Sequence, residues 1–202
     1  MKQISYFFLS LFLFISCGKE KNTISKESQF LSANSSDSFS PDSIDGKLED
    51  TSKGLEVQIP MSNDQLKNWI PEKIGKMDQW KLIVGHKLGM QMSGAIATYR
   101  ESGKEEQQIS LEVLDGAGAT GAVMLKSINQ KLSLEYEEQL ETGYSRIYER
   151  EKIRVWEKYN SLEHSSEIEY VIGERFHFRF KGHLIQMDEL WEFVSEVMKE
   201  MY

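Results

Sequence analysis

Residues 175–180 read RFHFRF, a stretch in which phenylalanine alternates with a cationic or polar side chain. Successive side chains of a β-strand point to opposite faces of a sheet, so this stretch predicts a strand with its three phenylalanines on one face. Arg175, His177 and Arg179 then share the other face. A strand with one apolar and one polar face is typical of an antiparallel sheet that is buried on one side.

Six other stretches alternate in the same way and also predict strands. They are residues 80–85, 94–100, 109–114, 144–150, 153–159 and 168–172. The connections between the later stretches are short, which favours antiparallel neighbours, because a parallel pair needs a crossover of a dozen or more residues.

Three helices are expected around these strands. Ser62 and Gln65 have the spacing of a capping box, which predicts a short helix that ends before Pro71. Residues 117–132 predict a central helix, and residues 189–201 predict a C-terminal helix with Asp188 as its cap. The predicted fold class is therefore α+β, a largely antiparallel sheet covered by helices, and the order of elements is analogous to that of an α/β/α sandwich.

The start of the chain has the features of an export signal. Lys2 precedes an apolar run, residues 4–15, which is too short for a transmembrane helix because a span takes about 20 residues. The run leads into residues 14–17, FISC, whose Cys17 is the only cysteine of the chain. These four residues resemble the lipobox of bacterial lipoproteins. The resemblance implies that residues 1–16 are a cleaved signal peptide and that Cys17 carries the lipid.

Residues 17–53 are predicted to form a disordered tether, because they are rich in Ser, Asp, Asn and Lys and lack helical or strand periodicity. A flexible coil of this length has a root-mean-square reach of about 30–35 Å. The tether is similar to those of Bacteroidota lipoproteins. The resemblance implies a cell-envelope protein that is held by lipid, at the outer membrane, on its periplasmic or surface face. Residues 54–202 are expected to form a single globular domain.

The charge of the chain excludes some partners. The formal net charge is −8 and becomes −9 in the mature chain, because Lys2 is the only charged residue of the leader. An acidic chain is a poor nucleic-acid binder, since phosphate neutralisation requires clustered Lys and Arg. The four histidines, His86, His164, His177 and His183, lack the spacing of metal ligands, so no metal site is predicted.

Residues 116–121, GAGATG, fit the G-x-G-x-x-G pattern of dinucleotide-binding turns. The preceding strand alternates, however, and the strand order is antiparallel, so we expect no nucleotide cofactor. The favoured interpretation is a tightly packed turn. The other is a site for a non-nucleotide anion or a partner at Asp115, Gly116, Gly118 and Gly121.

A second candidate site is the polar face of the predicted sheet. If the strands align, this face carries a cationic and aromatic patch that suits a glycan, an anionic polymer or an acidic protein. Its residues are Arg154, Trp156, Lys158, Arg175, His177 and Arg179. The alternative is a solvated face on which Glu149, Glu157, Glu167 and Glu169 neutralise these cations through cross-strand pairs.

These features favour a non-enzymatic binding or assembly module with an envelope protein or a glycan as partner. The region from 66 to 118 is similar to domains of bacterial envelope proteins, and this similarity implies no active site. The alternative function is a small envelope hydrolase, or a ligand-modifying enzyme, with a pocket near Asp115, His177 and Arg179.

The lipobox resemblance generates a direct prediction. Cys17→Ser removes the acylated atom, so the variant should incorporate no fatty acid and should accumulate as the uncut precursor or as a soluble form. Metabolic labelling with a fatty acid, followed by detergent partitioning, measures both effects. A Cys17→Ser protein that is still labelled and still partitions with detergent contradicts the prediction.

Overall fold

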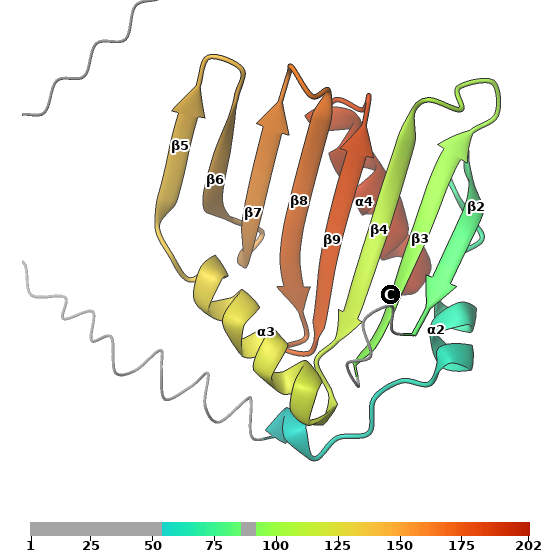
Figure 1. The fold of residues 1–202 in the computed structure, drawn as a ribbon, viewed down its shortest axis with the longest axis vertical. Coiled ribbons are helices and arrows are strands. Elements are labelled where there is room, and N and C mark those ends of the chain that lie inside the picture. Colours follow the sequence, from blue (N-terminus) through green and yellow to red (C-terminus); the bar gives the residue numbers. More distant parts are fainter. Residues whose placement is uncertain (1–53, 86–91) are drawn as a thin grey trace, which may run out of the picture. The chain divides into compact units, whose positions relative to one another are not determined.

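The computed structural model describes residues 54–85 and 92–202. Within this part of the chain, nine strands form one fully antiparallel sheet in the order β1-β2-β3-β4-β9-β8-β7-β6-β5 (Figure 1). The strands are β1 (Lys73–Ile74), β2 (Met77–Val84), β3 (Ser93–Glu101), β4 (Gln108–Asp115), β5 (Tyr136–Leu140), β6 (Gly143–Arg150), β7 (Ile153–Asn160), β8 (Ser165–Ile172) and β9 (Phe176–His183).

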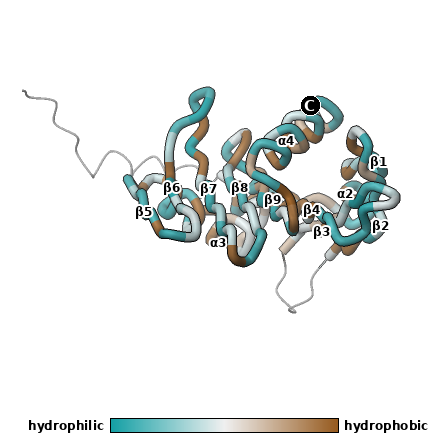
Figure 2. The backbone as a smooth tube through the Cα atoms, turned by 90° about the horizontal axis from the view of Figure 1, so that it is seen from above, coloured by the Kyte–Doolittle hydropathy of each residue, from teal (hydrophilic) through white to brown (hydrophobic). Residues whose placement is uncertain are grey.

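The helices are α2 (Asn63–Trp69), α3 (Gly118–Leu132) and α4 (Met187–Met201). Helices α2 and α4 pack on one face of the sheet, and α3 lies on the other face (Figure 2). The predicted antiparallel sheet with flanking helices is confirmed, although more of the chain lies in the sheet than the sandwich analogy suggests. No helix in residues 54–85 and 92–202 is long and apolar enough to cross a membrane.

Helix α3 links two antiparallel meanders. The chain runs through β1 to β4, follows α3 to the far edge of the sheet, and returns through β5 to β9. Strand β9 then pairs with β4, with Val113 opposite Phe178 and Leu111 opposite Phe180. The last strand of one meander therefore lies in the centre of the sheet and joins the two halves.

The main core lies between the sheet and α4. Phe178 and Phe180 are fully buried there, as the alternation in β9 predicts, and each stacks on Tyr170 with ring centroids 5.9 Å apart. Phe193 of α4 contacts Phe180 from above, edge to face. Burial of each of these aromatic side chains contributes roughly 1.5–3 kcal/mol to folding.

Capping boxes begin two of the helices, α2 and α4. Ser62 and Gln65 form the predicted capping box of α2. The prediction of Asp188 as the cap of α4 is wrong, because α4 begins two residues earlier with a capping box between Gln186 and Glu189. Asp188 lies instead in the first helical turn, where a negative charge interacts favourably with the helix dipole.

Strand β5 has no counterpart in the sequence prediction. All five of its residues are exposed, so neither face of the strand has an apolar pattern. The strand forms through backbone pairing with β6 at the edge of the sheet, with Tyr136 opposite Ile147. Acidic side chains on such an edge disfavour pairing with a further chain.

The packing of β9 against α4 predicts a large difference between two truncations. Phe178→Ala leaves a cavity in the core and should lower the free energy of unfolding by about 3–5 kcal/mol. Val123→Ala is the control, because Val123 is an exposed residue of α3 and should change stability by less than about 0.5 kcal/mol. Urea unfolding measures both values, and equal losses would contradict this assignment of the core.

Candidate functional site

The structure places the predicted cationic and aromatic residues of β7 and β9 on the face that carries α3. Trp156, Glu169 and Arg179 lie in one row across β7, β8 and β9, because Trp156 is opposite Glu169 and Glu169 is opposite Arg179. Lys158 lies in the next row, opposite Glu167. The face therefore alternates cationic and acidic strands.

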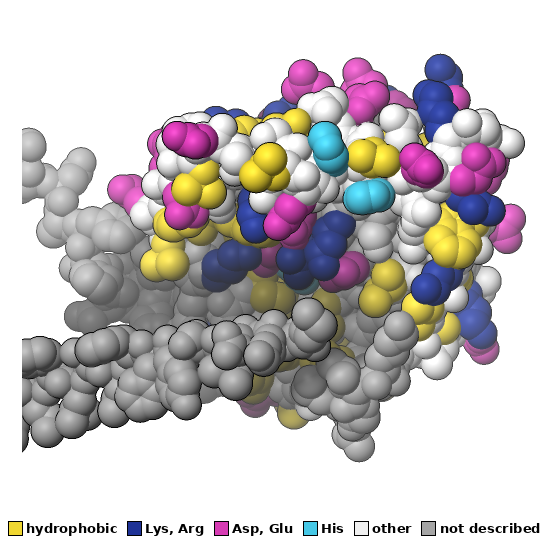
Figure 3. All heavy atoms as spheres, turned by 45° about the horizontal axis from the view of Figure 1, so that its top comes forward, with side chains coloured by type: hydrophobic (Ala, Val, Ile, Leu, Met, Phe, Trp, Pro, Cys, Tyr) yellow, Lys and Arg dark blue, Asp and Glu magenta, His cyan; other side chains and the backbone are white. Residues whose placement is uncertain are grey.

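Close ion pairs neutralise much of this face. Arg179 pairs with Glu167 at 2.5 Å, and Lys181 pairs with Glu112 at 3.2 Å. The view in Figure 3 likewise shows Lys and Arg side chains interspersed with Asp and Glu on the described surface. This arrangement favours the interpretation of the face as a charge-balanced sheet surface.

Helix α3 occupies part of the same face. Lys131 of α3 pairs with Glu169 at 2.7 Å, and its ammonium group lies 3.8 Å from the ring centroid of Trp156. Arg154 donates hydrogen bonds to the carbonyl oxygens of Leu132, the last residue of that helix, and of Leu134, just after it. Arg154 and Trp156 therefore hold α3 in place, which limits their availability to a partner.

Glu169 is the buried acid beneath α3. Burial alone raises its pKa, but contacts from His177 and Lys131 outweigh this effect and lower the pKa to about 2. His177 Nε2 lies 3.3 Å from Glu169 Oε1, without the geometry of a hydrogen bond. His164 and His183 are exposed, and His86 lies outside the described residues. No group of three or more potential metal ligands occurs in the described chain.

Arg175 and Asp115 form a separate, structural junction. The buried carboxylate of Asp115 accepts two hydrogen bonds from Arg175, at 2.7 and 2.8 Å, and one each from the backbone N–H groups of Met61 and Ala117. Burial raises the pKa of Asp115, but these donors outweigh it and keep the pKa below its usual range. The junction fixes the end of β4, the start of α3 and the turn before β9.

The glycine-rich turn packs closely around this junction. A Cβ at Gly116 would lie 2.8 Å from the carbonyl oxygen of Arg175, and one at Gly121 would lie 2.7 Å from that of Asp115. Gly118 has a φ of +80°, a conformation that side-chain-bearing residues rarely adopt. Backbone geometry and close packing therefore account for all three glycines.

The alternative pocket of Asp115, His177 and Arg179 does not form. Asp115 is opposite Phe176 and points to the α4 face, whereas His177 is opposite Leu114 and points to the α3 face with Arg179. The sheet separates the carboxylate from the other two side chains. Glu157 does form a cross-strand ion pair, with Arg146, but it shares the α4 face with Val155 and so does not neutralise the cations beside Trp156.

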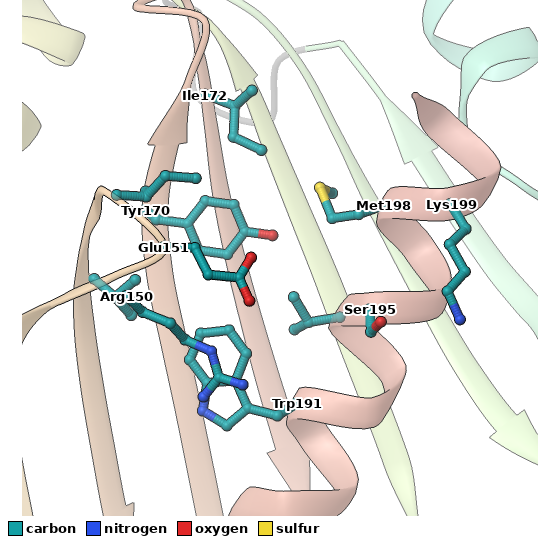
Figure 4. Close-up of a pocket in the computed structure, with 11 residues that line it drawn as sticks. Arg150, Glu151, Tyr170, Ile172, Trp191, Ser195, Met198 and Lys199 are labelled. Carbon is teal, nitrogen blue, oxygen red and sulfur yellow. The ribbon is translucent and has the colours of Figure 1, made fainter.

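A groove of about 370 Å³, here called the α4 groove, lies between α4 and the hairpin of β6 and β7 (Figure 4). Its size falls within the range of small-molecule sites. Strands β7 and β8 form its floor, α4 forms one wall, and the β6–β7 turn forms the rim. The lining residues are Arg150, Glu151, Ile153, Val155, Tyr170, Ile172, Trp191, Val194, Ser195, Met198 and Lys199.

Trp191 is fixed in the wall of the α4 groove from two sides. Its indole N–H donates to Glu157 at 2.8 Å, and the guanidinium of Arg150 lies 4.1 Å from its ring centroid. Glu157 is 1 % exposed and also accepts hydrogen bonds from Tyr144, Tyr148 and Arg146. Burial raises the pKa of Glu157, but these four donors together lower it.

The rim of the α4 groove contains a strained turn. Glu151 and Lys152, which join β6 to β7, have φ values of 51° and 68°. A turn with two positive φ values favours Asn and Gly, and other residues cost about 1–2 kcal/mol each. The turn places Glu151 at the mouth of the groove, where its carboxylate points inward in Figure 4. Backbone strain of this kind is frequent at functional sites.

Sequence reasoning did not identify the α4 groove. Its residues come from three separated segments, and Val155, Tyr170 and Val194 occupy the apolar positions of ordinary strand and helix patterns. The one available signal was the alternation in β7, which places the acidic Glu157 on the same face as Val155. Comparison with family models, curated proteins and solved structures finds no match to this chain.

The Glu157 cluster predicts a specific loss of stability. Glu157→Gln weakens the charge-assisted hydrogen bonds from four residues and should lower the free energy of unfolding by about 1.5–3 kcal/mol at neutral pH. Because folding lowers the pKa of Glu157, its contribution is present above pH 4.5 and is lost as the pH falls further. The variant should therefore lose less stability in acid than the wild type.

Urea unfolding at pH 7 and in steps below pH 4.5 tests both statements. Glu149→Gln is the control, since Glu149 is an exposed residue of the same hairpin. If Glu149→Gln and Glu157→Gln have the same effect at both pH values, the cluster does not stabilise the fold.

Proposed function

We propose that this chain is a lipid-anchored protein of the bacterial cell envelope that binds a small ligand in the α4 groove. The anchor rests on Cys17 and the lipobox-like residues 14–17, and residues 18–53 give the domain a reach from the outer membrane. The binding function rests on one observation, a partly apolar groove of ligand size whose lining holds a buried hydroxyl, that of Tyr170, with no partner in residues 54–85 and 92–202.

The groove is a better ligand site than the α3 face because several of its apolar side chains are partly exposed. On the α3 face, an anionic partner must first displace Glu167 from Arg179 or Glu112 from Lys181. In the α4 groove, the partly exposed side chains of Ile153, Ile172 and Met198 already border an open space. A ligand gains from covering this surface without breaking an ion pair. An envelope protein or a glycan on the α3 face remains a secondary proposal, centred on Lys158.

Binding is favoured over covalent chemistry by the groove's polar residues. Ser195 carries the one nucleophilic hydroxyl on the α4 wall, and Lys199 lies one turn further along α4. The ammonium of Lys199 pairs with Glu196 at 2.6 Å and the Lys199 side chain is 65 % exposed, so no described contact positions it as a base for Ser195. The polar residues of the groove therefore favour binding of a ligand over covalent chemistry at Ser195.

Blocking the groove tests the proposal. The neutral fluorophore N-phenyl-1-naphthylamine should bind the chain of residues 18–202 saturably, at one site. Ser195→Trp places a large side chain at the exposed rim and should weaken binding by at least about tenfold, since a filled site admits a ligand only with strain. Glu200→Trp, an equally exposed position of α4 outside the groove, should leave binding unchanged.

Fluorescence titration and thermal melts of all three proteins complete the test. If wild type binds no fluorophore, or if Ser195→Trp binds it as tightly as Glu200→Trp does, the α4 groove is not the binding site.

A further inference from the structure

We propose that the α4 groove selects a neutral ligand whose apolar body carries a carbonyl group, and that this carbonyl accepts a hydrogen bond from Tyr170. This inference rests on the proposed function and goes further, because it names the chemical class of the ligand and the residue that recognises it through a hydrogen bond.

Tyr170 has a hydroxyl that finds no hydrogen-bond partner among the described residues. The side chain is 4 % exposed, and its oxygen makes no hydrogen bond within the described chain. The ring stacks on both Phe178 and Phe180, and this packing favours its present orientation. An unpaired buried hydroxyl destabilises the free protein, so a ligand that pairs with it recovers that free energy.

The hydroxyl faces the groove. Tyr170 lines the space together with Met198, and in Figure 4 its oxygen points from β8 toward Met198 on α4. Met198 is half-buried, and its unbranched thioether side chain changes rotamer easily. A small movement of Met198 would open the hydroxyl to a ligand in the groove.

The protonated hydroxyl of Tyr170 favours a ligand that carries a hydrogen-bond acceptor. Burial raises the pKa of Tyr170, so the phenol keeps its proton at physiological pH and acts as a hydrogen-bond donor. The floor around it consists of Ile153, Val155 and Ile172. These side chains suit an apolar ligand body and offer no second polar partner to the ligand's acceptor.

The charges at the rim disfavour an ionised acceptor. Glu151 points into the groove and repels an anion, and Lys199 is already paired with Glu196. Arg150 is stacked on Trp191 at the outer edge. A carboxylate beside Tyr170 would thus be desolvated without a facing cation, which is unfavourable, whereas a carbonyl oxygen needs only the one donor.

A matched pair of ligands tests this inference. 2-Acetylnaphthalene and 2-isopropylnaphthalene have the same branched shape, and the second has a methyl group in place of the carbonyl oxygen. Displacement of N-phenyl-1-naphthylamine from residues 18–202 gives the affinity of each. Tyr170→Phe should weaken the ketone by about three- to tenfold, the usual contribution of one hydrogen bond, and should leave the hydrocarbon within about twofold.

Tyr148→Phe is the control, because its hydroxyl is bonded to Glu157 rather than unpaired. It should lower the melting temperature without changing the ratio of the two affinities. Tyr170→Phe should preserve or raise the melting temperature, since it removes an unpaired polar group. A lower melting temperature for Tyr170→Phe would show that the hydroxyl is satisfied in the free protein and would overturn the inference.

The outcomes separate this inference from the proposed function. If both ligands bind, Ser195→Trp blocks both, and Tyr170→Phe leaves their ratio unchanged, the groove binds apolar molecules but Tyr170 does not select a carbonyl. If 2-naphthoate binds more tightly than the ketone, the ligand class is anionic and the inference is wrong. If neither the ligands nor the fluorophore bind, the proposed function itself fails.

Discussion

The alternation of side chains in β9 is the constraint on which the rest of the structure depends. This strand pairs with β4 on one side and β8 on the other, so it joins the two meanders into one sheet. Its inward residues, Phe178 and Phe180, are fully buried beneath α4. Its outward residues bond to acids, as Arg179 does to Glu167. A shift of one residue would bury the cations and expose the phenylalanines.

The α4 groove follows from how α4 sits on this sheet. The helix packs mainly against β8 and β9, and β7 is the next strand of the sheet on the far side of β8. Trp191 spans the remaining distance and donates to Glu157 of β7. A buried carboxylate costs desolvation energy, and here the bonds from Trp191, two tyrosines and Arg146 offset it. The cluster therefore holds α4 to the far half of the sheet while a space remains beneath the helix.

The sequence predicted the parts of the fold that local patterns control. Strict alternation identified the face of the phenylalanines in β9, and the spacing of Ser62 and Gln65 identified the start of α2. Strand β5 was missed because both its faces are exposed. The cap of α4 was misassigned because Gln186 and Asp188 both precede an amphipathic run, and only the tertiary path of the chain decides between them.

The sites were harder to predict because they depend on contacts across the sheet. The cations of β7 and β9 do share a face. The sequence alone, however, does not show which residues from other elements contact them. Lys131 of α3 lies over the ring of Trp156, and Arg175 forms an ion pair with Asp115. The groove combines Arg150, Tyr170 and Trp191 from three elements, and no short motif links them. A charged patch that is prominent in the sequence thus became a support for α3, while the proposed binding site lies on the opposite face.

A crystal structure of residues 18–202 with N-phenyl-1-naphthylamine tests the central claim, that the α4 groove is a ligand site, most directly. Our account predicts electron density for the naphthalene ring between α4 and the floor of β7 and β8, with the side chain of Met198 displaced from its position over Tyr170. Density for the fluorophore on the α3 face instead, beside an empty α4 groove, would contradict it.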